Sequence, residues 1–210
     1  MSDAHVYPSD VAFTPAVKSV QARKGSREAF AQLERGRGWR TEIDENLAAF
    51  LAETNSFYLA TASAGGQPYI QHRGGPKGFI KVINEKTLGF ADYRGNRQYI
   101  TLANLSENDR AFLFLLDPGR PQRITLWGRA WVVEDDPPLT ERLFDDGYKA
   151  RPERVILFTI EAWDANCSSH IVTRFTEAEI AGAFAAVKTK IAELEAENAR
   201  LRAALATPSK

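Results

Sequence analysis

The sequence has few residues that build covalent or metal cross-links, and it has no excess of either charge. Cys167 is the only cysteine among 210 residues, which excludes an intramolecular disulfide and argues against a zinc site built on cysteines. A single cysteine also fits a reducing, cytoplasmic location. Lysine plus arginine equals aspartate plus glutamate, at 27 each, so we expect neither nucleic acid nor an anionic membrane as a partner. Any bound anion must therefore meet a local cluster of donors.

Long apolar runs and nucleotide-binding glycine motifs are also missing. The first thirty residues carry charged side chains throughout, so we expect no signal peptide. No run is long and apolar enough for a membrane-spanning helix. Neither GxGxxG nor GxxxxGK[ST] occurs, and strand and helix patterns do not alternate, which disfavours a doubly wound nucleotide-binding fold.

Short strand-like segments fill the middle of the chain. The predicted strands cover residues 57–62, 69–73, 79–83, 87–91, 111–116, 123–133 and 155–160. Turn-forming residues separate them, as in 64–67 and 117–119. Short strands at close spacing with few helices between them predict a mostly antiparallel sheet or barrel with flanking helices.

The N-terminal region differs in composition from the strand-rich part. Residues 1–40 form a predicted arm in which 1–25 are polar, interrupted by Pro8 and Pro15, and partly ordered at best. A short helix is predicted over 26–35. A firmer helix is predicted to begin near Thr41, where Thr41 and Asp44 resemble a capping box. The strand-rich domain is expected to span 41–175.

The sequence pattern of the C-terminal region, 176–206, predicts a helix with a heptad repeat. Apolar residues recur at alternating spacings of four and three, interrupted by Asn198. Asn198 falls at heptad position a, and a single buried Asn at this position commonly favours a parallel dimer in register. The apolar positions are Ile180, Phe184, Val187, Ile191, Leu194, Leu201 and Leu205. The alternative is an amphipathic helix that lies on its own barrel.

Arginines, asparagines and glycines gather in the segment 72–104. Arg73 ends one predicted strand, and Asn96 and Arg97 follow another, so these side chains could converge if the strands are neighbours. The planar guanidinium of arginine suits a phosphate. Gly74 and Gly75 would let backbone approach a flat ligand closely. The alternative is that glycine-rich turns and exposed arginines are common on any barrel.

Four blocks of sequence resemble the FMN-binding split barrels of the pyridoxamine 5′-phosphate oxidase-like family. The blocks are residues 66–79 (GQPYIQHRGGPKGF), 92–97 (DYRGNR, followed by Asn104 and 108–110), 126–130 (LWGRA) and 163–171 (WDANCSSHI). The resemblance implies a six-stranded antiparallel split β-barrel and a homodimer with FMN at the subunit interface. The substrate-phosphate pattern of the enzyme that names the family is not found, which argues against that particular activity.

The resemblance also implies which residues bind the cofactor. Residues 73–76 would lie along the flavin ring with their amides near N5 and O4. Asn96, Arg97 and Asn104 would hold the phosphate or ribityl chain. Residues near the C-terminal end of the barrel would reach the flavin from the partner chain. The predicted cofactor-binding residues are His72, Arg73, Gly74, Gly75, Pro76, Lys81, Tyr93, Asn96, Arg97, Asn104, Arg123, Trp163, Asn166 and His170.

The function implied is a flavin-dependent oxidoreductase that acts on an unidentified small molecule, with NAD(P)H as a possible electron donor. No catalytic residue is assigned, because the cofactor itself carries the hydride chemistry. One alternative is a non-catalytic flavin-binding or redox-sensing module. Another is the same barrel with haem or the deazaflavin F420 as its ligand. Cys167 fits a small buried hydrophobe better than a nucleophile.

Overall fold

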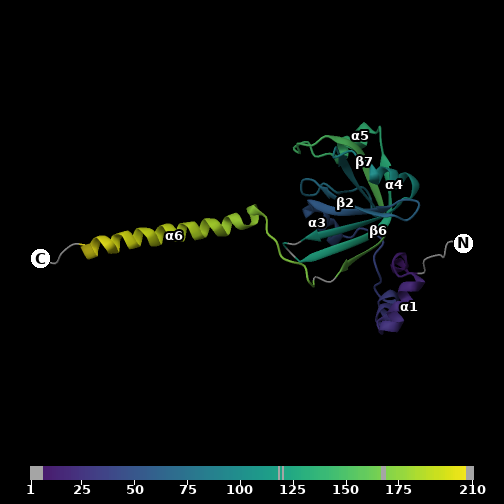
Figure 1. The fold of residues 1–210 in the computed structure, drawn as a ribbon, viewed down its shortest axis with the longest axis horizontal. Coiled ribbons are helices and arrows are strands. Elements are labelled where there is room, and N and C mark those ends of the chain that lie inside the picture. The colour runs from purple at the N-terminus through teal and green to yellow at the C-terminus, as the bar shows by residue number, and fades with distance from the viewer. Residues whose placement is uncertain (1–6, 118, 120, 167–168, 207–210) are drawn as a thin grey trace. The chain divides into compact units, whose positions relative to one another are not determined.

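The computed structural model describes residues 7–117, 119, 121–166 and 169–206. The chain forms two compact units. One comprises Met1–Asp117 with Pro121–Ser169, and the other contains the C-terminal helix. The helices are η1 (Pro8–Val11), α1 (Pro15–Lys24), α2 (Arg27–Arg35), α3 (Glu45–Glu53), α4 (Ile100–Glu107), α5 (Pro137–Leu143) and α6 (Glu177–Ala206) (Figure 1).

The first unit is built on an antiparallel sheet that forms a split barrel. The strands are β1 (Ser56–Ala62), β2 (Pro68–Gly74), β3 (Lys81–Val82), β4 (Thr87–Tyr93), β5 (Arg110–Asp117), β6 (Gln122–Val133) and β7 (Pro152–Asn166). Their order across the sheet is β2-β1-β5-β6-β7-β4-β3. The described residues thus form seven strands, as many as the segments predicted from the sequence and one more than the six-stranded barrel that the family resemblance implied. The short β3, within the predicted segment 79–83, pairs with β4.

One apolar cluster holds the barrel together. Alternate residues of β1, β5 and β6 point inward, as in Phe57, Leu113 and Leu126, and each is almost fully buried. The two-residue period of a strand places every second side chain on the core face. Helix α3 covers part of this core with Leu47 and Leu51.

The N-terminal region has more structure than its sequence suggested. Pro15 opens α1, and the Thr14 side chain accepts a hydrogen bond from the Val17 amide. Proline suits the first position of a helix because the amide it lacks would have no partner there. The predicted arm over 1–25 therefore contains a ten-residue helix. After α2, the Trp39 ring stacks on the ring of Trp127 of β6, with the two ring centroids 4.5 Å apart.

The predicted start of the helix before the barrel needed correction. Helix α3 begins at Glu45, and its cap is Asp44, whose carboxylate accepts a hydrogen bond from the Leu47 amide at 2.9 Å. Thr41 lies before that cap. Helix α5 spans Pro137–Leu143, and its cap is Asp136, whose carboxylate accepts a hydrogen bond from the Leu139 amide at 3.0 Å.

A bulge interrupts the longest strand pair. The register between β6 and β7 shifts between Trp127 and Gly128. A Cβ atom built on Gly128 would lie 2.0 Å from the carbonyl oxygen of Thr159. Any side chain at position 128 would collide with the backbone of the paired strand β7, so glycine is required there.

Helix α6 runs for 30 residues. Within the described residues, no helix is both long enough and apolar enough to cross a bilayer. The apolar residues of α6 lie on the helix surface and are mostly exposed, from 36% for Ile180 to 88% for Leu205.

Candidate functional site

A shallow pocket lies where β2 and β4 meet the loop before α4 and the start of β7. Its volume is about 390 Å³, including space open to solvent. The pocket brings together segments that are far apart in the sequence. The lining residues are Tyr69, Gln71, Arg73, Asp92, Tyr93, Gly95, Asn96, Arg97, Gln98, Tyr99, Ile100, Thr101, Leu102, Glu153 and Arg154.

A buried carboxylate between two guanidinium groups forms the floor of this pocket. Asp92 is paired with Arg73 of β2 and with Arg154 of β7, the latter at 3.2 Å. The side chains of all three are at most 12% exposed. Charges buried in this way need partners because desolvation is costly. The cluster carries one net positive charge before the outer residues are counted.

Arg154 has further partners at the edge of the pocket. Its guanidinium contacts the carboxylates of Glu134 at 2.9 Å and Glu153 at 3.3 Å. It also lies 5.5 Å from the centre of the Tyr99 ring. These contacts hold the planar group in place, and a guanidinium held in place loses less freedom when it binds an anion.

The loop before α4 presents polar groups at the rim. Arg97 and Tyr99 adopt left-handed backbone angles, with φ of 62° and 57°, which is uncommon for residues other than glycine. The Arg97 Nε donates to the Tyr99 hydroxyl at 2.9 Å. The Gln98 amide donates to the Asn96 side chain at 3.2 Å. Arg97 is exposed and extends the positive charge of the buried cluster toward solvent.

Helix α4 begins at the pocket. Tyr99 is its first flanking residue, and among the described residues no side chain caps the helix there. The first amides of a helix lack partners within the helix and attract anions. The Thr101 hydroxyl donates to the Gln71 side chain at 2.9 Å and joins α4 to β2.

Two buried polar atoms of the lining residues have no hydrogen-bond partner in the described part of the chain. They are the Nε of Arg73 and the hydroxyl oxygen of Tyr93. Burial raises the pKa of the Tyr93 hydroxyl to about 12, and the negative charge of Asp145 adds to the shift. Buried polar atoms normally have partners. These two therefore leave donors for a ligand that carries acceptor oxygens.

The structure brings four of the predicted binding residues to this pocket. Arg73, Tyr93, Asn96 and Arg97 all line it. Arg73 on β2 and the segment 94–97 after β4 thus lie together, as the sequence predicted for neighbouring strands. His72 also lies on β2 but is not among the lining residues. It is exposed, and its ring packs against the Tyr58 ring at a centroid distance of 5.6 Å.

Gly74, Gly75 and Pro76 are not among the lining residues. The Gly75 amide donates to the carbonyl of Asn55 at 3.0 Å, so that amide is already used within the chain. A Cβ atom on Gly75 would lie 2.6 Å from the Phe79 ring. The packing of a core phenylalanine against Gly75 thus accounts for a glycine at this position in the folded chain.

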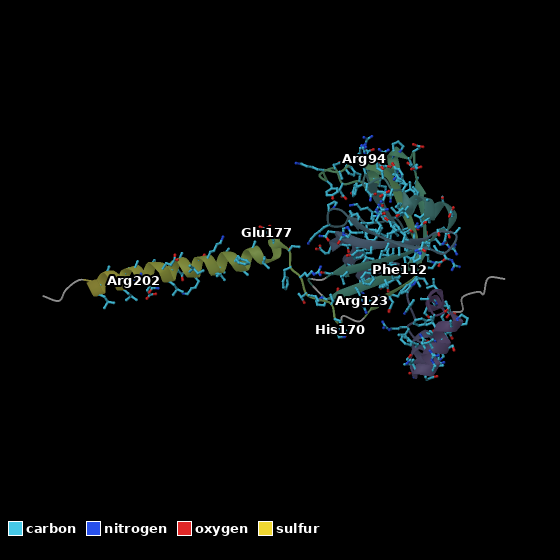
Figure 2. All side chains as sticks on the ribbon, in the orientation of Figure 1. Arg94, Phe112, Arg123, His170, Glu177 and Arg202 are labelled. Atoms are coloured by element: carbon cyan, nitrogen blue, oxygen red, sulfur yellow. The ribbon has the colours of Figure 1, made fainter. Side chains whose placement is uncertain are left out.

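Other predicted residues have separate roles in the fold. Lys81 pairs with Asp145 at 2.8 Å, and the buried Asn104 amide donates to the Thr61 hydroxyl at 3.0 Å. Arg123 lies on β6, and Figure 2 shows it at a different end of the barrel from Arg94, which adjoins the pocket. None of these three lines the pocket as described.

Trp163 belongs to the core and is 1% exposed. Its indole nitrogen donates to the carbonyl of Glu42 at 2.8 Å, and the Arg40 guanidinium lies 4.6 Å from its ring centre. Within this chain its ring is therefore packed in the core and is not among the described lining residues of the pocket.

The last predicted residues give less information. His170 belongs to the unit that contains α6, is exposed and has a left-handed φ of 64°. Only the backbone of Asn166 is described, as the end of β7. Cys167 lies outside the described residues.

Sequence reasoning missed Arg154, Asp92 and Tyr99. Asp92 stands in one of the matching blocks, beside residues that were chosen. Arg154 was not detectable from local sequence, because it lies near the start of β7 and reaches the pocket only through the pairing of β4 with β7.

A second hollow of about 860 Å³ is lined by β1, β5, β6 and η1. Its walls include Phe112 and Trp127. Arg129 there is paired with Asp109 at 2.7 Å and Glu161 at 2.8 Å. None of the predicted binding residues is among its described lining residues. The smaller pocket at β2 and β4 therefore fits a phosphorylated ligand better, despite its size.

Comparison with known families identifies one match. The family described as pyridoxamine 5′-phosphate oxidase matches residues 43–167, which cover β1 to β7. Comparison with curated proteins gives no significant match.

Several solved structures are similar to this chain at low identity. An FMN-binding protein from Syntrophomonas wolfei is 16% identical over 72% of this chain and 97% of its own, with a TM-score of 0.46. An F420 reductase is 20% identical over 58% and 98%, with a TM-score of 0.44. HutZ, the heme storage protein from Vibrio cholerae, is 16% identical over 58% and 93%, with a TM-score of 0.39.

Proposed function

The chain belongs to the pyridoxamine 5′-phosphate oxidase family, and we propose that it is a flavoprotein that binds FMN in the pocket between β2, β4, α4 and β7. The observation that supports this most is the meeting of Arg73, Arg97 and Arg154 with the uncapped start of α4. Guanidinium groups and helix N-termini are the two common protein partners of phosphate. Asp92 holds Arg73 and Arg154 in place, so the donors are arranged before any ligand arrives.

The donor set suits FMN in charge and in hydrogen bonding. In this proposal Arg97, Asn96 and the α4 amides hold the phosphate. The unpartnered Nε of Arg73 and the Tyr93 hydroxyl supply donors for oxygens elsewhere on the ligand. The carboxylates of Asp92, Glu134 and Glu153 offset the charges of Arg73 and Arg154, so the exposed Arg97 supplies the positive charge that favours an anionic ligand.

The pocket is too open to enclose FMN with one chain. Sites for small molecules usually bury most of the ligand surface, whereas this pocket is shallow and faces solvent. We therefore propose a homodimer in which a second chain covers the exposed side of the flavin.

FMN, when bound, supplies a ring that accepts a hydride and so supports oxidation or reduction of a small molecule. The chain contributes binding, orientation and positive charge near the ring, with Arg73 as the candidate for that charge. We therefore propose an FMN-dependent oxidoreductase of unassigned substrate. A non-catalytic flavin-binding or redox-sensing module uses the same pocket and differs only in lacking turnover.

Haem and F420 are the competing ligands. Haem iron requires an axial side chain such as His, Met, Cys or Tyr. Among the described lining residues there is no His, Cys or Met, and the tyrosines are the only candidates. F420 also carries a phosphate, so the donor set does not separate it from FMN.

The experiment is to purify the full chain, record its absorbance spectrum and determine the mass of any molecule released on denaturation. A two-banded flavin spectrum and the mass of FMN support the proposal, while haem or F420 overturns it. If the protein is isolated without ligand, equilibrium titration with FMN, F420 and haem in parallel decides among the three. Preference for F420 or haem contradicts the proposal.

Anaerobic mixing of the FMN-loaded protein with NADH or NADPH then tests catalysis. Bleaching of the flavin, followed by its return when an electron acceptor is added, supports an oxidoreductase. Retention of oxidised FMN under all these conditions favours the binding module.

A further inference from the structure

Helix α6 carries an apolar seam that has no partner among the described residues. The seam residues recur at alternating spacings of four and three from Ile180 to Leu205, which places them along one side of the helix. Figure 2 shows side chains projecting outward along the helix between Glu177 and Arg202. Seven of the eight seam positions are apolar and at least 36% exposed: Ile180, Phe184, Val187, Ile191, Leu194, Leu201 and Leu205.

An apolar seam of this kind requires a packing partner. Isolated helices are marginally stable in water, and most of their stability in proteins comes from packing of the apolar face. Seven large apolar side chains on one narrow stripe also exceed what scattered surface residues explain. The width of the stripe, two positions in every seven, matches a coiled coil better than a helix that covers a globular core.

We propose that the seam packs against α6 of a second copy of this chain, in a parallel two-stranded coiled coil in register. This proposal goes beyond flavin binding and does not depend on it. In heptad terms, Phe184, Ile191, Asn198 and Leu205 occupy a positions, and Ile180, Val187, Leu194 and Leu201 occupy d positions. At about 1.5 Å of rise per residue, the helix is about 45 Å long.

Asn198 argues for the parallel orientation. In a parallel pair in register, each a residue meets the a residue of the partner, so the two Asn198 amides can hydrogen-bond to each other. In an antiparallel pair, a positions face d positions, and Asn198 would meet an apolar side chain. An amide buried against apolar atoms is unfavourable without a partner.

The flanking charges argue for the same arrangement. Lys190 at g would face Glu195 at e of the other helix, and Glu197 at g would face Arg202 at e. Both g–e′ pairs are attractive in a parallel pair of identical chains. Within one helix Lys190 contacts Glu193 at 3.1 Å, and both side chains are at least 60% exposed. Such an exposed pair is weak and exchanges readily for another.

Site-specific disulfide formation in the full-length chain tests orientation and register together. Leu201→Cys is made in a Cys167→Ser background, which removes the single native thiol. In the proposed pair the two introduced thiols face each other, so mild oxidation converts most of the protein into a covalent dimer. In an antiparallel pair centred on α6 they would lie about 30 Å apart.

Ala196→Cys in the same background is the matched control, because position 196 is f and points away from the seam. It is expected to give little covalent dimer under the same oxidant. Leu194→Glu combined with Leu201→Cys places two like charges in the seam and should suppress the cross-link strongly. Circular dichroism confirms that the barrel remains folded in each variant.

Equal cross-linking at 201 and 196 would indicate random collision and overturn the proposal. Absence of cross-linking at 201 in folded protein would overturn it as well, whatever the FMN content. A covalent dimer that Leu194→Glu leaves unaffected would show that the barrel, and not α6, brings the two thiols together, which also contradicts it.

Discussion

Asp92 and Arg154 lie 62 positions apart in the sequence, yet their side chains meet at 3.2 Å in the floor of the pocket. Asp92 also accepts a hydrogen bond from Arg73. The pairing of β4 with β7 brings the first two together, and Arg73 joins them from the far edge of the sheet. One carboxylate thus sets the position of two of the three arginines that meet in the proposed FMN site.

Replacing Asp92 should weaken both the fold and the site. Asp92→Asn leaves two buried guanidinium groups facing an amide, and removal of one partner from a buried ion pair costs about 3–5 kcal/mol. We expect the free energy of unfolding, measured in urea, to fall by that order. The matched control is Asp109→Asn, which alters an ion pair to Arg129 with both side chains nearly half exposed. It should cost less than about 1 kcal/mol, and equal losses would show that the Asp92 cluster is not buried in solution.

Arg97→Ala should weaken FMN binding without unfolding the protein. Arg97 is exposed at the pocket rim, so its loss costs the fold little, while a charge-assisted bond to a phosphate is lost. We expect the FMN dissociation constant, measured by fluorescence titration, to rise by about tenfold or more. Arg142→Ala removes an exposed arginine outside the pocket and serves as the control. An unchanged dissociation constant in Arg97→Ala would place the phosphate elsewhere.

Tyr93 should make the protein sensitive to alkali. Its pKa is raised from 10.0 to about 12 in the folded chain, so the neutral phenol is favoured by folding. The corresponding stability is fully present below pH 10 and is lost as the pH rises from 10 to about 12. Tyr93→Phe removes a buried hydroxyl that lacks a partner among the described residues, so it should be neutral or stabilising near pH 7.

The measurement is the urea midpoint of the wild-type protein and of Tyr93→Phe across this pH range. The difference between them should grow in favour of Tyr93→Phe as the pH rises. Tyr58→Phe, at a ring that is 41% exposed, controls for the loss of one tyrosine hydroxyl. A parallel decline in wild type and Tyr93→Phe would mean that the hydroxyl is not buried in the folded protein.

Gly128→Ala should destabilise the barrel severely. The new Cβ would lie 2.0 Å from the backbone oxygen of Thr159 and 2.9 Å from the Phe158 ring, and a backbone oxygen cannot move aside without disturbing the β6–β7 pair. We expect a loss of about 3 kcal/mol or more, at the upper end for overpacked sites. Gly147→Ala is the control, because no described atom lies within 4 Å of its added Cβ. Similar thermal midpoints for the two variants would argue against the bulge.

The sequence predicted the elements of the barrel well because strand signals are local. Alternating side chains and turn residues located the segments that became β1, β2, β4, β5 and β6. The prediction was wrong at Pro15. A proline alone indicates an interruption, but Pro15 suits the first turn of α1 because Thr14 caps that helix. The prediction also underestimated β7, whose ends pair with β4 and β6 outside the apolar stretch at 155–160.

The site was predictable in part for the same reason. Arg73, Tyr93, Asn96 and Arg97 stand in compact blocks that resemble the family, and they do meet. Gly75, Asn104 and Trp163 stand in or near the same blocks, yet the fold uses them for core packing and internal hydrogen bonds. Sequence proximity cannot distinguish a residue that faces a ligand from one that faces the core.

Periodicity and motif spacing are properties of neighbouring residues, so the strand segments, the family and the heptad seam of α6 could be predicted without coordinates. Three features could not: Arg154 reaches the pocket, Asp92 is buried between two arginines, and Trp163 is buried in the core. Those outcomes depend on which distant strands pair and in which register, and pairing is set by the packing of the whole sheet.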